Sequence, residues 1–191
     1  MRNLDVLKLS ILLLLSILVF DSCKKGADDP LISFRSRNNR ICAKWKLDSG
    51  TGKFTTTSTT TSARELGYSY SGSDFTTTAI GQDGTQTIIT YIAYNFQMEL
   101  DKNNIIKYTE TYNLNGVFNS ISINGYWYWL DDKKKTMINI PLSSTDAFDF
   151  DNWEVTELKH NQITLKYSIT STVLGVTETD DRELVFSNLE K

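Results

Sequence analysis

The sequence predicts an all-β protein whose strands form a single antiparallel up-and-down β-barrel. Three observations lead to this fold class. Apolar and polar residues alternate along several segments, as they do in strands, where successive side chains point to opposite faces. Short turn signals separate these segments, and no segment has a convincing helical period. The 191 residues include 9 Tyr and 9 Phe but only 2 Pro, and this composition also favours strands.

The amino terminus predicts a targeting segment. Arg2 and Lys8 precede an apolar run over residues 9–20, as in the charged and hydrophobic regions of a secretory signal. The run is shorter than the stretch of about 20 residues that spans a bilayer. We therefore assign residues 1–22 to a signal peptide and exclude them from the expected fold.

The residues around the expected cleavage point predict a lipid anchor. Phe-Asp-Ser-Cys at residues 20–23 resembles a bacterial lipobox, in which a small residue precedes a lipidated cysteine. The resemblance implies cleavage before Cys23, acylation of Cys23 and attachment to a membrane. The alternatives are an ordinary secreted protein, or a disulfide between Cys23 and Cys42. With Cys23 acylated, we expect Cys42 to be a small buried hydrophobe.

The expected cellular location and the domain boundaries follow from this anchor. Residues 23–37 lack periodicity, and we expect them to form the lipidated cysteine and a flexible tether. Residues 38–191 then form one β-barrel domain. The expected location is the cell envelope, with the protein lipid-anchored at the outer membrane on its periplasmic face or at the cell surface. The formal net charge of −3 argues against a nucleic-acid partner, because no broad basic surface is available for phosphates.

The segment over residues 87–100 alternates clearly. Its even positions are mostly apolar and its odd positions become polar toward the end, so we expect the even row to face inward. That row is Ile88, Thr90, Ile92, Tyr94, Phe96, Met98 and Leu100. The next expected strand, residues 105–114, carries Glu110 within its apolar row. Glu110 either contacts a ligand inside the barrel, or a bulge or strand end turns it toward solvent.

The aromatic block Tyr-Trp-Tyr-Trp at residues 126–129 follows the same alternation. Trp127 and Trp129 share a row with Ile121 and Ile123, so we expect both tryptophans inside the barrel. Tyr126 and Tyr128 then point outward, where their hydroxyl groups meet water.

Further strands are expected near both ends of the domain. They lie over residues 41–47, 136–142, 153–158, 163–170 and 180–189. Residues 51–86 are rich in Thr, Ser and Gly. They either form one or two polar strands with a long loop, or part of the segment is disordered and of low complexity. The total is eight to ten strands, and an immunoglobulin-like sandwich is the alternative to the barrel.

Three pieces together resemble the lipocalin-like domains of bacterial surface lipoproteins. They are AKWKL at 43–47, YNFQMELDKNNIIKYTETY at 94–112 followed by INGYWYWLDDKKKTMINI at 123–140, and WEVTELKHNQITLKY at 153–167. The resemblance covers roughly residues 38–190. It implies a calycin-type barrel of about eight strands with a cavity for one small ligand. It also implies that Trp45 closes the base of the barrel, packed by Arg182.

The inward aromatic rows supply a candidate ligand site. Its residues are Trp127, Trp129, Tyr94, Phe96, Tyr108, Glu110 and Tyr112. The alternative is that these side chains simply fill the core, as in many small barrels.

No pattern in the sequence predicts catalysis. His160 is the only histidine and has no second histidine or paired cysteine near it, so we expect no metal. No cofactor motif and no Ser/His/Asp order stands out, and we expect a protein that is not an enzyme. We expect a lipid-anchored binding protein for a small hydrophobic or amphipathic ligand. The alternative is a surface interaction module with a packed barrel, whose loops contact a protein or a glycan.

Overall fold

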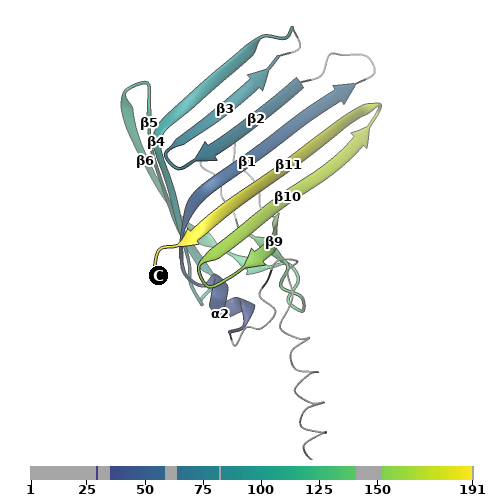
Figure 1. Ribbon diagram of the computed structural model, residues 1–191. Helices are drawn as coiled ribbons and strands as arrows, with labels where there is room; N and C mark the ends of the chain where they lie inside the picture. The colour runs from purple at the N-terminus through teal and green to yellow at the C-terminus, as the bar shows by residue number, and fades with distance from the viewer. Residues whose placement is uncertain (1–28, 30–34, 59–63, 82, 141–151, 191) are drawn as a thin grey trace, which may run out of the picture.

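The computed structural model describes residues 29, 35–58, 64–81, 83–140 and 152–190, and these residues form one antiparallel sheet with one short helix (Figure 1). The predicted all-β class is confirmed. The helix is α2 (Arg37–Ile41). The strands are β1 (Lys44–Ser58), β2 (Arg64–Ser71), β3 (Asp74–Ile80), β4 (Gln86–Leu100), β5 (Ile105–Leu114), β6 (Val117–Tyr126), β7 (Tyr128–Trp129), β8 (Met137–Asn139), β9 (Asn152–Leu158), β10 (Gln162–Val173) and β11 (Val176–Asn188).

The strand order is that of a meander. It runs β6-β5-β4-β3-β2-β1-β11-β10-β9-β8-β7, so in this order every neighbour is consecutive in sequence except β1 and β11, the first and last strands, and an additional pairing joins β1 to β4. The two edge strands, β6 and β7, are separated in sequence only by Trp127. The described strands number eleven, one more than the upper end of the prediction, because the aromatic block breaks into β6 and β7; β2 and β3 are polar strands within residues 51–86, as one of the two alternatives predicted.

The sheet has two halves, because β1 changes its partner along its length. Lys44–Lys46 pair with β4, whereas from Ser49 onward β1 pairs with β2. The β2–β3 hairpin therefore lies between β1 and β4 only in the far half of the sheet. We call the half that carries α2 the base and the other the distal half (Figure 1). A bulge between Leu47 and Ser49 marks the change, as bulges do where a strand bends.

The hydrophobic core occupies the base and extends to β2 and β3. Its largest fully buried side chains include Trp45, Trp153, Tyr94, Tyr108, Phe75, Phe96 and Phe186. The predicted alternation holds there: Trp127 and Trp129 are buried, whereas Tyr126 and Tyr128 are exposed. Burying these apolar and aromatic side chains is the main force that holds the base together.

The alternation predicted for residues 87–100 is wrong in its first half. Ile88 and Ile92 are exposed, and Tyr91 packs on the core instead. The cause is a register shift between Ile92 and Asn95, where Ala93 has a φ of 53°. One extra residue at a bulge turns every earlier side chain to the opposite face.

The amino-terminal residues dock on the base. The Asp29 carboxylate lies 3.5 Å from Arg37 and 3.3 Å from Arg40, and all three side chains are buried. Asp29 Oδ1 also accepts a hydrogen bond from the amide of Leu158 (2.8 Å). Asp29 and Arg37, both within the expected tether of residues 23–37, therefore lie buried on the base, where the carboxylate pairs with two guanidinium groups.

Candidate functional site

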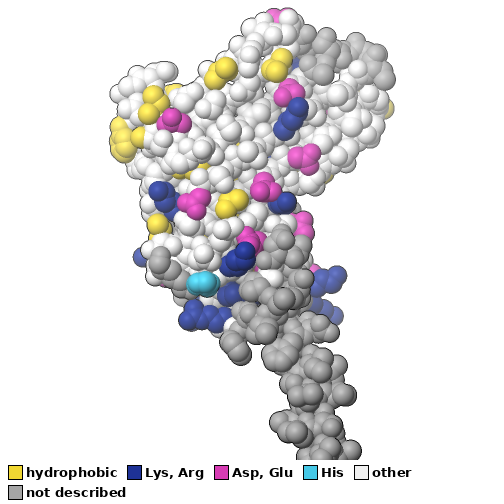
Figure 2. All heavy atoms as spheres, in the orientation of Figure 1, with side chains coloured by type: hydrophobic (Ala, Val, Ile, Leu, Met, Phe, Trp, Pro, Cys, Tyr) yellow, Lys and Arg dark blue, Asp and Glu magenta, His cyan; other side chains and the backbone are white. Residues whose placement is uncertain are grey.

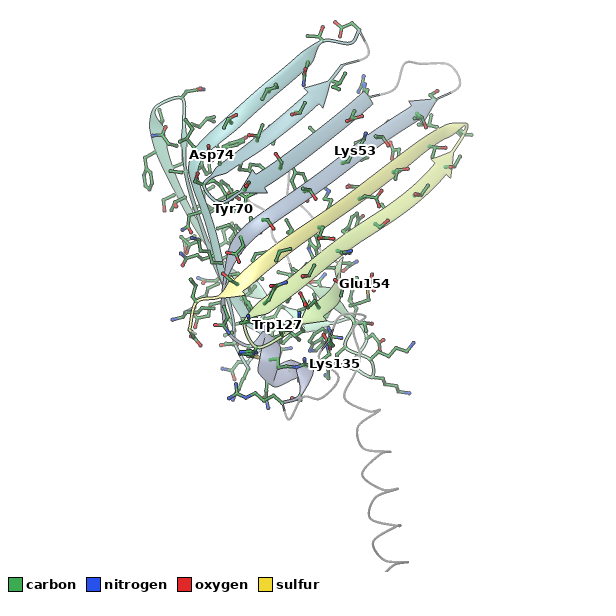
Figure 3. All side chains as sticks on the ribbon, in the orientation of Figure 1. Lys53, Tyr70, Asp74, Trp127, Lys135 and Glu154 are labelled. Carbon is green, nitrogen blue, oxygen red and sulfur yellow. The ribbon has the colours of Figure 1, made fainter. Side chains whose placement is uncertain are left out.

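The structure buries most of the predicted ligand residues. Tyr94, Phe96, Tyr108 and Glu110 are buried, and Tyr112 is partly buried against the core. Trp127 and Trp129 belong to the same core cluster, and Figure 3 shows Trp127 near α2. Phe96 stacks on Tyr108 with centroids 5.6 Å apart, and Tyr94 stacks on Tyr112 at 6.3 Å. At this level of the sheet the side chains pack on one another.

Glu110 faces inward and is 0% exposed, so no bulge turns it to solvent. β5 pairs regularly with β6, and Glu110 lies opposite Ile121 and Phe96. The Tyr94 hydroxyl interacts with the buried Glu110 carboxylate. Burial and this carboxylate raise the pKa of Tyr94 far above that of a solvated tyrosine. The pair therefore links β4 to β5 inside the core.

The two tryptophans of the aromatic block join neighbouring segments at the base. The indole Nε1 of Trp127 donates to the carbonyl of Asp101 (3.1 Å), and its backbone amide donates to Asn104 (2.9 Å). The indole Nε1 of Trp129 donates to Asn38 Oδ1 in α2 (2.5 Å). Because their indole N–H groups donate hydrogen bonds to other segments of the protein, both tryptophans have a structural role.

The structure does not bring Trp45 and Arg182 together. Trp45 pairs with Asn188, whereas Arg182 pairs with Gly52, six positions further along β11. Trp45 is fully buried at the base, and its indole donates to the carbonyl of Ile41 (2.8 Å). The expected contact between Trp45 and Arg182 is wrong because of this register. The buried arginines at the base are Arg37 and Arg40.

Arg182 belongs to a cluster in the middle of the sheet that the sequence did not predict. Its guanidinium forms two hydrogen bonds with Asp180 (2.6 and 2.8 Å) and lies 5.4 Å from the centroid of the Tyr68 ring. The Tyr68 ring lies directly over Gly52 of β1. Burial raises the pKa of Tyr68 strongly, although Arg182 partly opposes the shift. The sequence signal was the Gly-Thr-Gly of residues 50–52 inside a strand, which marks a close approach of another group.

A hollow opens in the distal half next to this cluster. Its volume is about 610 Å³, and it is lined by Phe54, Arg64, Glu65, Leu66, Ala79, Ile80, Gly81 and Asp83. Phe54 and Asp180 pair across β1 and β11, and Phe54 and Leu66 pair across β1 and β2. The hollow therefore continues the row of side chains that neighbours Tyr68 and Arg182.

Large apolar side chains are exposed around this half of the sheet. We call them the distal apolar surface: Leu66, Ile88, Ile89, Ile92, Val117, Phe118, Ile169, Val173 and Leu174. Phe118 is 69% exposed and Leu174 is 99% exposed, each next to a hairpin end. Figure 2 shows hydrophobic side chains grouped over the β5–β6 hairpin, whereas Lys and Arg gather at the base. The members lie on both faces of the sheet, since Ile88 and Ile89 are consecutive in β4, and the group over the β5–β6 hairpin is the one that Figure 2 shows together. A group of exposed apolar side chains typically marks an interaction site.

The remaining sequence predictions concern Cys23, Cys42 and His160. Cys23 lies outside the described residues. Cys42 is a half-buried free thiol, and burial together with Asp101 raises its pKa. His160 lies between β9 and β10. Among the described residues no group of His, Cys, Asp or Glu side chains is arranged to hold a metal.

No protein-family model, no curated protein and no solved structure matches the chain. Within the described ranges, no helix has both the length and the apolar character needed to cross a bilayer.

Proposed function

We propose that the protein is a lipid-anchored, lipocalin-like module of the bacterial cell envelope, with acylated Cys23 as its anchor and a barrel-like base. The lipobox-like residues 20–23 support the anchor. The meander order and the pairing of β1 with β11 support the relationship to up-and-down barrels. The short step from β6 to β7 also supports it, because the two sheet edges are neighbours in the chain.

We propose further that the module acts by binding a protein partner through the distal apolar surface. The observation that carries this proposal is the contrast between the two halves of the sheet. The side chains expected to line an interior cavity are packed together, whereas nine large apolar side chains are exposed in the distal half. Aliphatic side chains on hairpin ends favour a protein surface, since burying them against another apolar surface is favourable.

A double substitution at the hairpin ends tests this function. Phe118→Ser with Leu174→Ser removes two exposed apolar side chains that do not contribute to the core. We expect the lipoprotein extracted from its envelope to lose its partner and to migrate as a smaller species on a native gel. The matched control is Lys107→Ser, an exposed position on β5. A complex of the same size for the wild-type protein, the double variant and Lys107→Ser would refute the proposal.

The hollow supports a second candidate, a small apolar ligand. Its volume of about 610 Å³ lies within the range of roughly 300–1,000 Å³ that small-molecule sites have. Native mass spectrometry of the gently purified protein tests this candidate. A co-purifying mass that is lost in Leu66→Glu, which changes the hollow, but kept in Ile92→Glu, which lies outside it, would support the ligand. A ligand-free mass in the wild-type protein would refute it.

A further inference from the structure

The outward side chains of the aromatic block have no role in the core or in the distal surface. Tyr126 is 72% exposed and Tyr128 is 47% exposed, and Leu130 is exposed next to them. They alternate with the buried Trp127 and Trp129, so the tryptophans fix the backbone from inside while the tyrosines point out. Tyrosine, with an apolar ring and a polar hydroxyl, is enriched where a protein meets the headgroup region of a membrane.

Three lysines follow these side chains after Asp131 and the exposed Asp132. Lys133 and Lys134 are exposed, and Lys135 lies with its Nζ 5.8 Å from the centroid of the Trp129 ring. The turn is held by Asp131, whose Oδ1 accepts hydrogen bonds from the amides of Lys133 and Lys134. The lysines therefore lie on a hydrogen-bonded turn at the base, the same end of the sheet as the tyrosines. Figure 3 shows Lys135 and Trp127 at the base, away from Lys53 and Asp74.

The same end of the molecule is the end nearest the expected anchor. Trp129 lies next to α2, since it binds Asn38 and its ring centroid lies 5.8 Å from the Arg37 guanidinium. Arg37 in turn is paired with the buried Asp29. Six residue steps separate Asp29 from Cys23 in the sequence, a span of at most about 20 Å when extended. An acyl chain on Cys23 would therefore hold this end of the sheet close to the bilayer.

We propose that this base surface, Tyr126, Tyr128, Leu130, Lys133, Lys134 and Lys135, rests on the anionic phospholipid headgroups of the membrane that carries the anchor. The proposal depends on the lipid anchor of the proposed function. The lysines supply charge complementarity to the phosphates, and the tyrosines and Leu130 supply the apolar contact at the headgroup boundary. The distal apolar surface then faces away from the bilayer, where a partner can reach it.

Spin labels report which end touches the bilayer. We would use the lipoprotein purified from its envelope in a Cys42→Ala background, with Tyr128→Cys or Phe118→Cys as the labelled position. The protein is reconstituted into vesicles of phosphatidylethanolamine and phosphatidylglycerol. The label at 128 is expected to be shielded from a water-soluble nickel chelate and accessible to oxygen. The label at 118 is expected to remain fully accessible to the chelate.

A charge reversal separates this inference from the anchor itself. In Lys133→Glu with Lys134→Glu, and in vesicles of phosphatidylcholine alone, we expect the label at 128 to become accessible to the chelate while the protein still floats with the vesicles. Wild-type protein that floats but has both labels equally accessible would overturn the inference and leave the anchor standing. Protein that does not float would overturn the anchor and the inference together.

Discussion

The substitution Gly52→Ala adds a methyl group where the structure has the Tyr68 ring. A Cβ built on Gly52 would overlap two ring carbons of Tyr68 and lie 2.7 Å from its hydroxyl oxygen. The ring is not free to swing away, because it packs on Phe75 with centroids 5.8 Å apart and carries the Arg182 guanidinium at 5.4 Å. Such overpacking costs about 1–3 kcal/mol. We expect a loss of about 2 kcal/mol, which lowers the Tm of a chain of this size by roughly 4–8 °C.

Gly67→Ala is the matched control. Gly67 lies in β2, opposite Lys53, and the nearest atom to its added Cβ is the Gly52 carbonyl oxygen at 3.8 Å, an ordinary contact. Because glycine in a strand is destabilising by about 0.5–1 kcal/mol relative to alanine, this change should leave Tm unchanged or raise it slightly. Thermal unfolding followed by circular dichroism measures both. Equal Tm values for the two variants would refute the packing of Tyr68 over Gly52.

Three further predictions concern buried polar groups. A double-mutant cycle of Tyr94→Phe and Glu110→Gln, measured by urea unfolding, should give a coupling of about 0.5–3 kcal/mol, since the two polar groups interact inside the core; a coupling of zero would contradict that interaction. Asp29→Ala should destabilise the protein by about 3–5 kcal/mol, because two buried guanidinium groups lose their carboxylate, whereas a loss below about 1 kcal/mol would show that residue 29 is not docked. Burial raises the pKa of Tyr68 and of Tyr94 above the value of about 10 of an unfolded tyrosine. The folded state therefore holds these protons longer, and stability that is complete below about pH 10 falls as the pH rises above it. The urea midpoint should fall less steeply with alkaline pH in Tyr68→Phe, and an unchanged slope would argue against the burial of that hydroxyl.

The sequence predicted the base of the sheet well because its side chains alternate without interruption. Burial of Trp127 and Trp129 and exposure of Tyr126 and Tyr128 all follow from a period of two. The period of two fails where a bulge occurs, and an alanine at position 93 does not indicate a bulge. Ile88 and Ile92, read as inward, are therefore exposed.

The contacts between distant segments were the hardest to predict. The register of β1 against β11 decides which residues face Trp45, and alternation alone cannot fix it. For that reason Arg182 was assigned to the wrong partner. Asp29 lies in a segment without periodicity, so the alternation of apolar and polar residues could not predict its pairing with Arg37 and Arg40. The distal hollow depends on strands β1, β2 and β3, whose many threonines gave no clear inward row.

The central claim is that the distal half of the sheet, and not its packed interior or its base, contacts the partner. Site-specific photo-crosslinking in the intact host tests it most directly. A photoreactive amino acid replaces Phe118 at the distal β5–β6 hairpin or, as the control, the exposed Lys107 on the same strand pair. We predict one discrete crosslinked protein from position 118, absent from position 107 and lost when Leu174→Ser is added. Equal crosslinking from both positions, or none from 118 while the native complex persists, would contradict the account.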